Sequence, residues 1–274
     1  MTATPERRLA QIALNAVSPY VVGIFTKYAS DDVSWTFATG VLIEFKGLRL
    51  ILTAGHVLSI PDVEGFKPVT EFRFSKPPRG GFPIRSNGVE QFWSPVPRSD
   101  DFHWVADMDS DLGAVFVSDL SAIQCFPLPA VSAPPLVGSD VFFCGYPRAG
   151  SVALQSGADV GDGALPNFQC ATVLDPAALP ALKSHQFAID YPNIDGIVTP
   201  AGFSGSMVWF DSIGRRRTLD ELGMGFTASA AGIVTDHLVA EQALVCTRVE
   251  KVAEFIQRLL LIAKTPGTVS QNMT

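Results

Sequence analysis

Short apolar runs separated by turn residues make up most of the chain, and their lengths are those of β-strands. The pattern predicts strands at 21–25, 35–39, 40–45, 48–53, 112–117, 140–147, 170–174, 186–190, 207–210, 231–235 and 243–246. Lys46-Gly47 separates two of these runs and predicts a hairpin. The stretch 61–100, rich in proline and glycine, is expected to form long connections. Many short strands with frequent turn signals favour an all-β fold of barrels or sandwiches.

The periodicity of a helix appears near both ends of the chain. Apolar residues recur at helical spacing between 9 and 16, which predicts an N-terminal helix within residues 1–17. A second apolar stripe begins at Val249 and predicts a C-terminal helix, with a tail, in residues 249–274. Thr247 and Glu250 have the spacing of a capping box, so we expect them to cap this helix.

A cluster of four prolines between Phe126 and Pro135 divides the strand-rich region. Proline lacks a backbone donor and disfavours both helices and central strands. We therefore expect a linker at 127–135 between two β units, residues 18–126 and 136–248.

The composition excludes several classes of protein. The chain has 274 residues, 47% of them hydrophobic and 17% charged, which is typical of a globular protein and not of a disordered one. Its net charge of −7 argues against a nucleic-acid partner. No apolar run reaches the roughly 18 residues of a membrane span, so we expect no membrane partner.

The four cysteines, scattered mostly through apolar segments, are expected to be buried free thiols in a reducing compartment. The N-terminal segment lacks the apolar core of a signal peptide. Together these features predict a cytoplasmic protein.

Candidate chemistry centres on Ser204, which lies between Gly202 and Gly205 just before a strand-like run. A serine nucleophile needs a tight turn whose backbone N–H groups are free to bind an oxyanion. A glycine-flanked serine is also a common feature of ordinary turns. A strand follows it instead of a helix, so it is not the nucleophile elbow of the α/β-hydrolases.

Two further residues complete a candidate set. His56 follows the small residues Ala54 and Gly55 at a predicted strand end, and Asp111 directly precedes the apolar strand at 112–117. Each has an ordinary structural interpretation, and Asp107 and Asp109 compete with Asp111.

The combination resembles the chymotrypsin-like (trypsin-fold) serine peptidases, including the bacterial HtrA-type branch. The matching segments are Thr53-Ala54-Gly55-His56, Asp111-Leu112-Gly113-Ala114-Val115, Gly145-Tyr146-Pro147, Gly202-Phe203-Ser204-Gly205, Gly232-Ile233-Val234-Thr235 and Thr247-Arg248-Val249. The resemblance implies two packed six-stranded antiparallel β-barrels with the site in the cleft between them. It also implies a serine endopeptidase without the PDZ module of many HtrA-type relatives.

The resemblance assigns a role to each residue. Ser204 attacks the peptide carbonyl, His56 is the general base, and Asp111 orients the imidazole. The N–H groups of Gly202 and Ser204 form the oxyanion hole, and Thr235 supports Asp111. No metal or cofactor is implied.

Two positions bear on activation and specificity. Phe203 replaces the aspartate that pairs with a newly cut N-terminus in zymogen-activated members, so we expect no such activation. The resemblance places Val198 on the floor of the specificity pocket and His237 and Leu244 on opposite walls. These residues predict a shallow specificity pocket that accepts small, uncharged side chains of the substrate. The rival interpretation is that His237 binds an acidic side chain.

Two other functions stay open. The chain could be an inactive module on the same fold that binds peptides or a partner protein, and an active enzyme could need a regulatory protein partner. A metal-dependent hydrolase has little support, because the four histidines are dispersed without a ligand motif.

Overall fold

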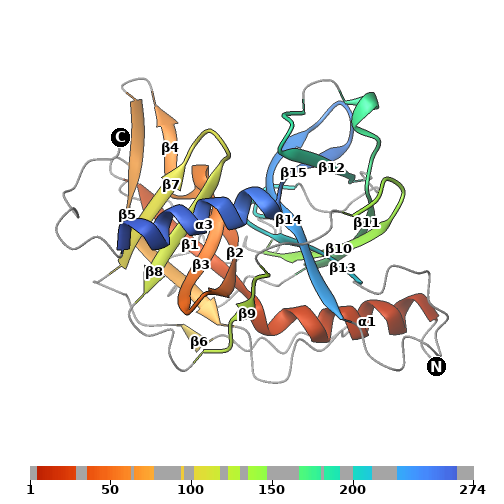
Figure 1. Ribbon diagram of the computed structural model, residues 1–274, viewed down its shortest axis with the longest axis horizontal. Coiled ribbons are helices and arrows are strands. Elements are labelled where there is room, and N and C mark those ends of the chain that lie inside the picture. Colours follow the sequence, from red (N-terminus) through yellow and green to blue (C-terminus); the bar gives the residue numbers. More distant parts are fainter. Residues whose placement is uncertain are drawn as a thin grey trace, which may run out of the picture.

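The computed structural model describes residues 5–28, 36–62, 65–76, 94–95, 102–117, 123–129, 135–146, 167–179, 182–191, 200–211 and 227–263. Two antiparallel sheets form the body of the protein, and each curves around its own apolar core (Figure 1). The predicted all-β fold of two packed antiparallel β units is confirmed.

The first sheet has the strand order β4-β5-β1-β2-β3-β8-β7. Two strands of two residues each, β6 and β9, pair with β5 and β2, and the β2–β9 pair is parallel. The strands are β1 (Val21–Tyr28), β2 (Thr36–Phe45), β3 (Leu48–Ala54), β4 (Ser59–Asp62), β5 (Gly65–Lys76), β6 (Ser94–Pro95), β7 (Phe102–Asp107), β8 (Leu112–Val117) and β9 (Phe126–Pro127).

The second sheet has the order β11-β10-β13-β14-β15-β12. A bridge between Val173 and Ile189 joins the segment after β11 to β12 at the other end of this order, which closes the sheet into a barrel. The strands are β10 (Asp140–Gly145), β11 (Asn167–Thr172), β12 (Gln186–Asp190), β13 (Met207–Asp211), β14 (Ala228–Leu238) and β15 (Ala243–Arg248).

The two described α-helices, α1 (Pro5–Val17) and α3 (Val249–Ala263), tie the sheets together. The first precedes β1 of the first sheet but packs against β10, β11 and β14 of the second. The other follows the second sheet and extends to the first (Figure 1). There Arg258 of α3 pairs with Asp107 of β7. Neither helix has both the length and the apolar character that a membrane crossing needs.

Aromatic residues fill the contact between the sheets. Trp209 of β13 packs edge-on against Phe126 at a centroid distance of 4.7 Å and lies 6.4 Å from Tyr20. Phe126 and Trp209 belong to a core cluster that also contains Val17 of α1 and Ile256 of α3, and Tyr20 packs against this cluster. The cluster fixes the position of the two sheets relative to each other. The candidate site depends on this position, because its residues come from both sheets.

Two expectations about local structure were wrong. The connections predicted for 61–100 are wrong for 65–76, because β5 is a twelve-residue strand that pairs with β1, while 77–93 and 96–100 lie outside the described residues. In β5, Phe72 and Phe74 are buried two residues apart, as in a strand, but buried Val69 does not fit this period, and Pro68 and Gly65 are turn signals in the sequence. The predicted capping box is also absent: Thr247 belongs to β15, its hydroxyl donates to the carbonyl of Ser110 at 2.8 Å, and no hydrogen bond joins it to Glu250 in the described part of the chain.

The predicted linker begins as part of the first sheet. The N–H of Leu128 donates to the carbonyl of Glu44 at 2.9 Å, and the Leu128 side chain is buried. Residues 130–134 and the predicted tail at 264–274 lie outside the described residues. The unit boundaries remain predictions.

Candidate active site

His56 lies in a single 3-10 turn, η2 (Gly55–Val57), directly after β3. The turn is closed by a hydrogen bond from the Leu58 N–H to the Gly55 carbonyl at 2.9 Å. A Cβ on Gly55 would lie 3.1 Å from Oδ1 of Asp111. The absence of a side chain at Gly55 therefore lets the β3 end and the Asp111 turn approach closely.

Asp111 lies between β7 and β8 with a φ of 49°, in the left-handed region that aspartate tolerates better than most residues. Both of its carboxylate oxygens face His56: the His56 backbone N–H donates to Oδ1 at 2.8 Å, and ring Nδ1 lies 2.8 Å from Oδ2. Of the two competing acids, Asp107 pairs with Arg258. Within the described residues, His56 is bonded to the carboxylate of Asp111 and not to that of Asp109.

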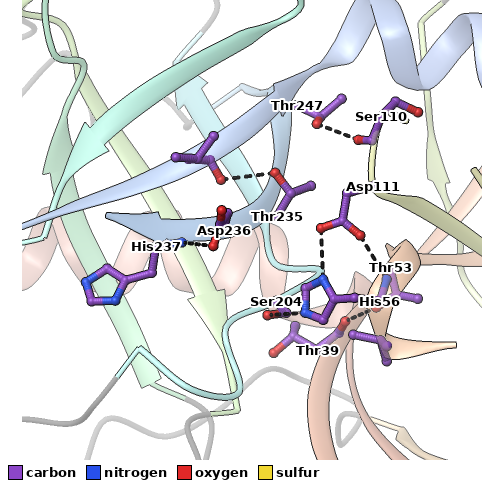
Figure 2. Close-up of polar contacts among 12 residues, drawn as sticks. Thr39, Thr53, His56, Ser110, Asp111, Ser204, Thr235, Asp236, His237 and Thr247 are labelled. Carbon is purple, nitrogen blue, oxygen red and sulfur yellow. Dashed lines mark hydrogen bonds and ion pairs between the residues drawn. The ribbon is translucent and has the colours of Figure 1, made fainter. Parts of the chain in front are cut away.

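Ser204 lies in the turn that precedes β13, and its Oγ is 3.0 Å from Nε2 of His56 (Figure 2). When Nδ1 of His56 carries a proton and donates it in a hydrogen bond to Asp111, Nε2 is free to accept a hydrogen bond from the Ser204 hydroxyl. The geometry therefore aligns a carboxylate and an imidazole from the first sheet with a hydroxyl from the second.

Opposing effects act on the pKa of His56. Burial disfavours the imidazolium and lowers this pKa, but the hydrogen bond and charge of Asp111, helped by the charge of Asp236, outweigh burial. The pKa of His56 therefore lies above its usual value of 6.5. The imidazole is thus a stronger base than a free histidine, which suits a group that takes a proton from a hydroxyl.

The backbone of the Ser204 turn leaves two donors available. Within the described residues, no hydrogen bond engages the N–H of Gly202 or of Ser204. The Phe203 carbonyl accepts from the Ser206 N–H at 2.8 Å. Because the C=O and N–H of a trans peptide point in opposite directions, the Ser204 N–H points away from Ser206. Gly202 has a φ of 101°, which a residue with a side chain rarely adopts.

Phe203 anchors the turn in the core of the second sheet. Its side chain is fully buried and packs edge-on against Phe143 and Tyr191, at centroid distances of 5.1 and 6.0 Å. Aromatic pairs of this geometry add about 0.5–1.5 kcal/mol beyond the burial of their area. The residue before the serine therefore stabilises the turn through apolar contacts.

The residues expected to support the site or line a pocket have different positions. The Thr235 hydroxyl donates to the carbonyl of Val245 at 3.3 Å, and its support of Asp111 stays a prediction. His237 and Leu244 are direct cross-strand partners on β14 and β15, so they lie side by side and not on opposite walls. Leu244 is buried in the core of the second sheet. Val198 lies outside the described residues.

The described part of the chain brings together no group of three His, Cys, Asp or Glu side chains that could hold a metal ion. All four cysteines are free thiols, and Cys144 and Cys246 are buried as expected. Cys170 is exposed, contrary to expectation.

Comparison with solved structures identifies the architecture. The serine endoprotease from Yersinia pestis matches with a TM-score of 0.55 and 15% identity, over 96% of this chain and 69% of that one. The Rv3671c protease from M. tuberculosis, in its active form, matches with a TM-score of 0.52 and 17% identity, over 98% and 91%. The chain has the fold of the trypsin-like serine proteases. Neither a protein-family model nor a curated protein sequence matches it.

Within this trypsin-like fold, two residues near the candidate site escaped the sequence analysis. Thr39 of β2 contacts the Ser204 turn through both its backbone and its side chain. Its signal in the sequence is a polar residue inside an apolar strand. Asp236 of β14 adds a second negative charge that acts on His56. It follows Thr235 directly, but nothing in the sequence shows that this stretch passes the imidazole.

Proposed function

We propose that the protein is a serine endopeptidase that cleaves peptide bonds through an acyl-enzyme. The observation that carries this proposal is the hydrogen-bonded line from Asp111 through His56 to Ser204, with distances of 2.8 and 3.0 Å. The likeness of the fold to two solved serine proteases supports it. The origin of the three residues in two different β units, which the sequence resemblance implies, supports it as well.

The geometry suits the following steps. Ser204 Oγ attacks the carbonyl carbon of the scissile bond while Nε2 of His56 takes the hydroxyl proton. Asp111 holds the proton on Nδ1 and stabilises the imidazolium. His56 then gives its proton to the leaving amine, and the peptide C–N bond breaks. Water, activated by the same imidazole, hydrolyses the acyl-enzyme and restores the serine.

The developing oxyanion would be bound by the N–H groups of Gly202 and Ser204. Donors aimed in advance at this charge need little reorganisation during the reaction, and losing one costs about 100- to 1,000-fold in kcat. The free donors of the turn and its anchored Phe203 support this role.

Activation would not depend on cleavage at the N-terminus. A phenylalanine cannot form the ion pair with an α-amino group, and the buried position of Phe203 gives the turn an apolar anchor instead. Control by a regulatory protein partner is compatible with this arrangement.

The proposed specificity is for small, uncharged side chains. It rests on the resemblance, which places His237 on a wall of the pocket, and not on Leu244, which is buried in the core of the second sheet. Burial lowers the pKa of His237, although Asp236 opposes this effect, so the neutral form of the ring predominates at pH 7. A neutral ring favours an uncharged side chain over the rival acidic one. We further propose a protein or peptide substrate and a cytoplasmic location.

The alternative is an inactive trypsin-fold module that binds peptides or a partner protein in the same cleft. Nothing in the described geometry favours it, because each of the three side chains is present and within hydrogen-bond distance of the next.

Cleavage of a diverse peptide library, read by mass spectrometry, tests the proposal. We expect the wild type to cut after small, uncharged residues and Ser204→Ala to leave the library intact. Cleavage after basic or large aromatic residues would refute the specificity. Binding of peptides without cleavage by either protein would favour the inactive module.

A further inference from the structure

Thr39 connects the two halves of the candidate site. It lies on β2 of the first sheet, is fully buried, and makes two hydrogen bonds to the Ser204 turn of the second sheet. Its N–H donates to the Ser204 carbonyl at 2.9 Å, and its Oγ1 donates to the Gly202 carbonyl at 2.7 Å. We infer that Thr39 is a positioning residue that holds the oxyanion turn in place opposite His56. This inference rests on the proposed function.

The direction of each hydrogen bond of the hydroxyl follows from its partners. The backbone N–H of Tyr146 donates to Thr39 Oγ1 at 2.8 Å, and this occupies a lone pair of the oxygen. The single hydroxyl proton must then go to the carbonyl of Gly202, which only accepts. Threonine is branched at Cβ, so its χ1 is stiff and the hydroxyl is held in one direction.

The two carbonyls that Thr39 holds lie on either side of the peptide that carries the Ser204 N–H. In the peptide before it, the Phe203 N–H donates to Pro200 at 3.0 Å while the Gly202 carbonyl accepts from Thr39. In the peptide after it, the Gly205 N–H donates to Val234 at 2.8 Å while the Ser204 carbonyl accepts from Thr39. Both flanking planes are therefore fixed at both ends, and the Ser204 N–H between them has little freedom.

Loss of the hydroxyl would release one of these planes. The Gly202 carbonyl would become a buried acceptor without a partner, which is costly. Because Gly202 has no Cβ, the peptide can rotate toward another donor. That rotation would remove one of the two fixed planes beside the peptide of the Ser204 N–H, so this N–H would be held less firmly toward the oxyanion.

The contact around Thr39 leaves little room for the turn to slide. A Cβ added at Gly205 would lie 2.0 Å from the Thr39 carbonyl oxygen and 2.3 Å from Oγ1 of Thr53. That carbonyl also accepts from the Thr53 hydroxyl at 2.8 Å. The backbones of the Ser204 turn and of β2 are in direct contact, and this contact fixes the distance between them. The hydroxyl of Thr39 therefore determines the orientation of the turn more than its distance from β2.

The experiment compares Thr39→Val, which removes the donor at similar volume, with Thr39→Ser, which keeps it. The matched control is Thr26→Val, another fully buried threonine of the first sheet, whose hydroxyl bonds to Tyr28. A fluorophosphonate probe reports on the site: a bond forms between Ser204 Oγ and phosphorus, fluoride leaves, and the hydroxyl proton goes to His56. The phosphoryl oxygen needs the same two N–H donors as an oxyanion.

We expect Thr39→Val to label with a maximal rate constant about 10- to 100-fold below that of the wild type, less than the loss of a whole donor. The probe concentration at half-saturation and the pH midpoint of the rate should not change, because His56 and Asp111 are untouched. Thr39→Ser and Thr26→Val should stay within about threefold of the wild type. Amide hydrogen exchange in 200–206 should rise only in Thr39→Val.

A folded Thr39→Val that labels at the wild-type rate would overturn the inference, as would a Thr39→Ser as slow as Thr39→Val. If Thr39→Val does not fold, Thr39→Cys replaces it in the experiment. Because a thiol is a weaker donor than a hydroxyl, Ser204 in Thr39→Cys must then be labelled more slowly than in Thr39→Ser. A wild type that is not labelled would refute the proposed function. Hydrogen exchange would then still decide whether the hydroxyl of Thr39 holds the turn.

Discussion

Substitution of Gly205 by alanine tests how closely the two sheets meet beside Ser204. The φ of Gly205 is 89°, and a left-handed conformation costs a residue with a side chain about 1–2 kcal/mol. The new Cβ would lie 2.0 Å from the Thr39 carbonyl oxygen, a backbone atom that cannot move alone. Overpacking of this kind costs about 1–3 kcal/mol. Loss of the hydrogen bond from Thr53 to that carbonyl adds about 1 kcal/mol.

We therefore expect Gly205→Ala to lower the free energy of unfolding by about 3–6 kcal/mol, a large share of the roughly 5–15 kcal/mol of a typical protein. Gly47→Ala is the matched control, because Gly47 has a similar φ of 83° but nothing within 4 Å of its added Cβ. It should lose only about 1–2 kcal/mol. Urea denaturation measures both values. Equal losses for the two variants would refute the packing between the Ser204 turn and β2.

Three further predictions concern charge and proton transfer. Asp111→Asn should lower the labelling rate by about 10⁴-fold. The single oxygen of the amide cannot accept from both the backbone N–H and Nδ1 of His56 as the two carboxylate oxygens do, so the imidazole would take the wrong tautomer. A decrease of less than tenfold would contradict this. Asp236→Asn removes a charge that raises the pKa of His56, so the neutral, active form should persist to lower pH and the acid limb of the rate profile should shift downward; an upward shift would reverse the assigned sign. Burial raises the pKa of Cys144 to about 12, so at pH 8 iodoacetamide should modify exposed Cys170 in the native protein and reach Cys144 only after unfolding, as peptide mapping can show.

The sequence predicted the parts of the fold whose local signals and tertiary roles agree. The turn at Lys46-Gly47 joins β2 to β3 as expected, with both residues in the left-handed region. The strand expected at 112–117 is β8. In these cases the apolar runs are also buried runs, so pattern and packing give the same answer.

Tertiary contacts decided the features that the sequence analysis missed. Thr247 has the spacing of a capping residue, but it belongs to β15, and its hydroxyl bonds to Ser110 in the other sheet. The strand β5 contains Pro68 and owes its existence to pairing with β1. Long-range pairing of this kind leaves no periodic signal in a short window.

The candidate site was predictable only as far as its three polar residues stand out in apolar surroundings. His56, Asp111 and Ser204 each precede or follow an apolar strand, and the structure brings them together. The contacts of Thr39 could not be predicted, because they join residues from different sheets. The predicted opposite positions of His237 and Leu244 failed for the same reason, since the register of β14 and β15 makes them partners.

The central claim is that Ser204 is an activated nucleophile. The most direct test treats the purified protein with a fluorophosphonate and locates the adduct by mass spectrometry, with Ser204→Ala as the control. We predict a single adduct on Ser204 that is absent from the variant. A folded wild-type protein that carries no adduct, or carries it on another residue, would contradict the claim.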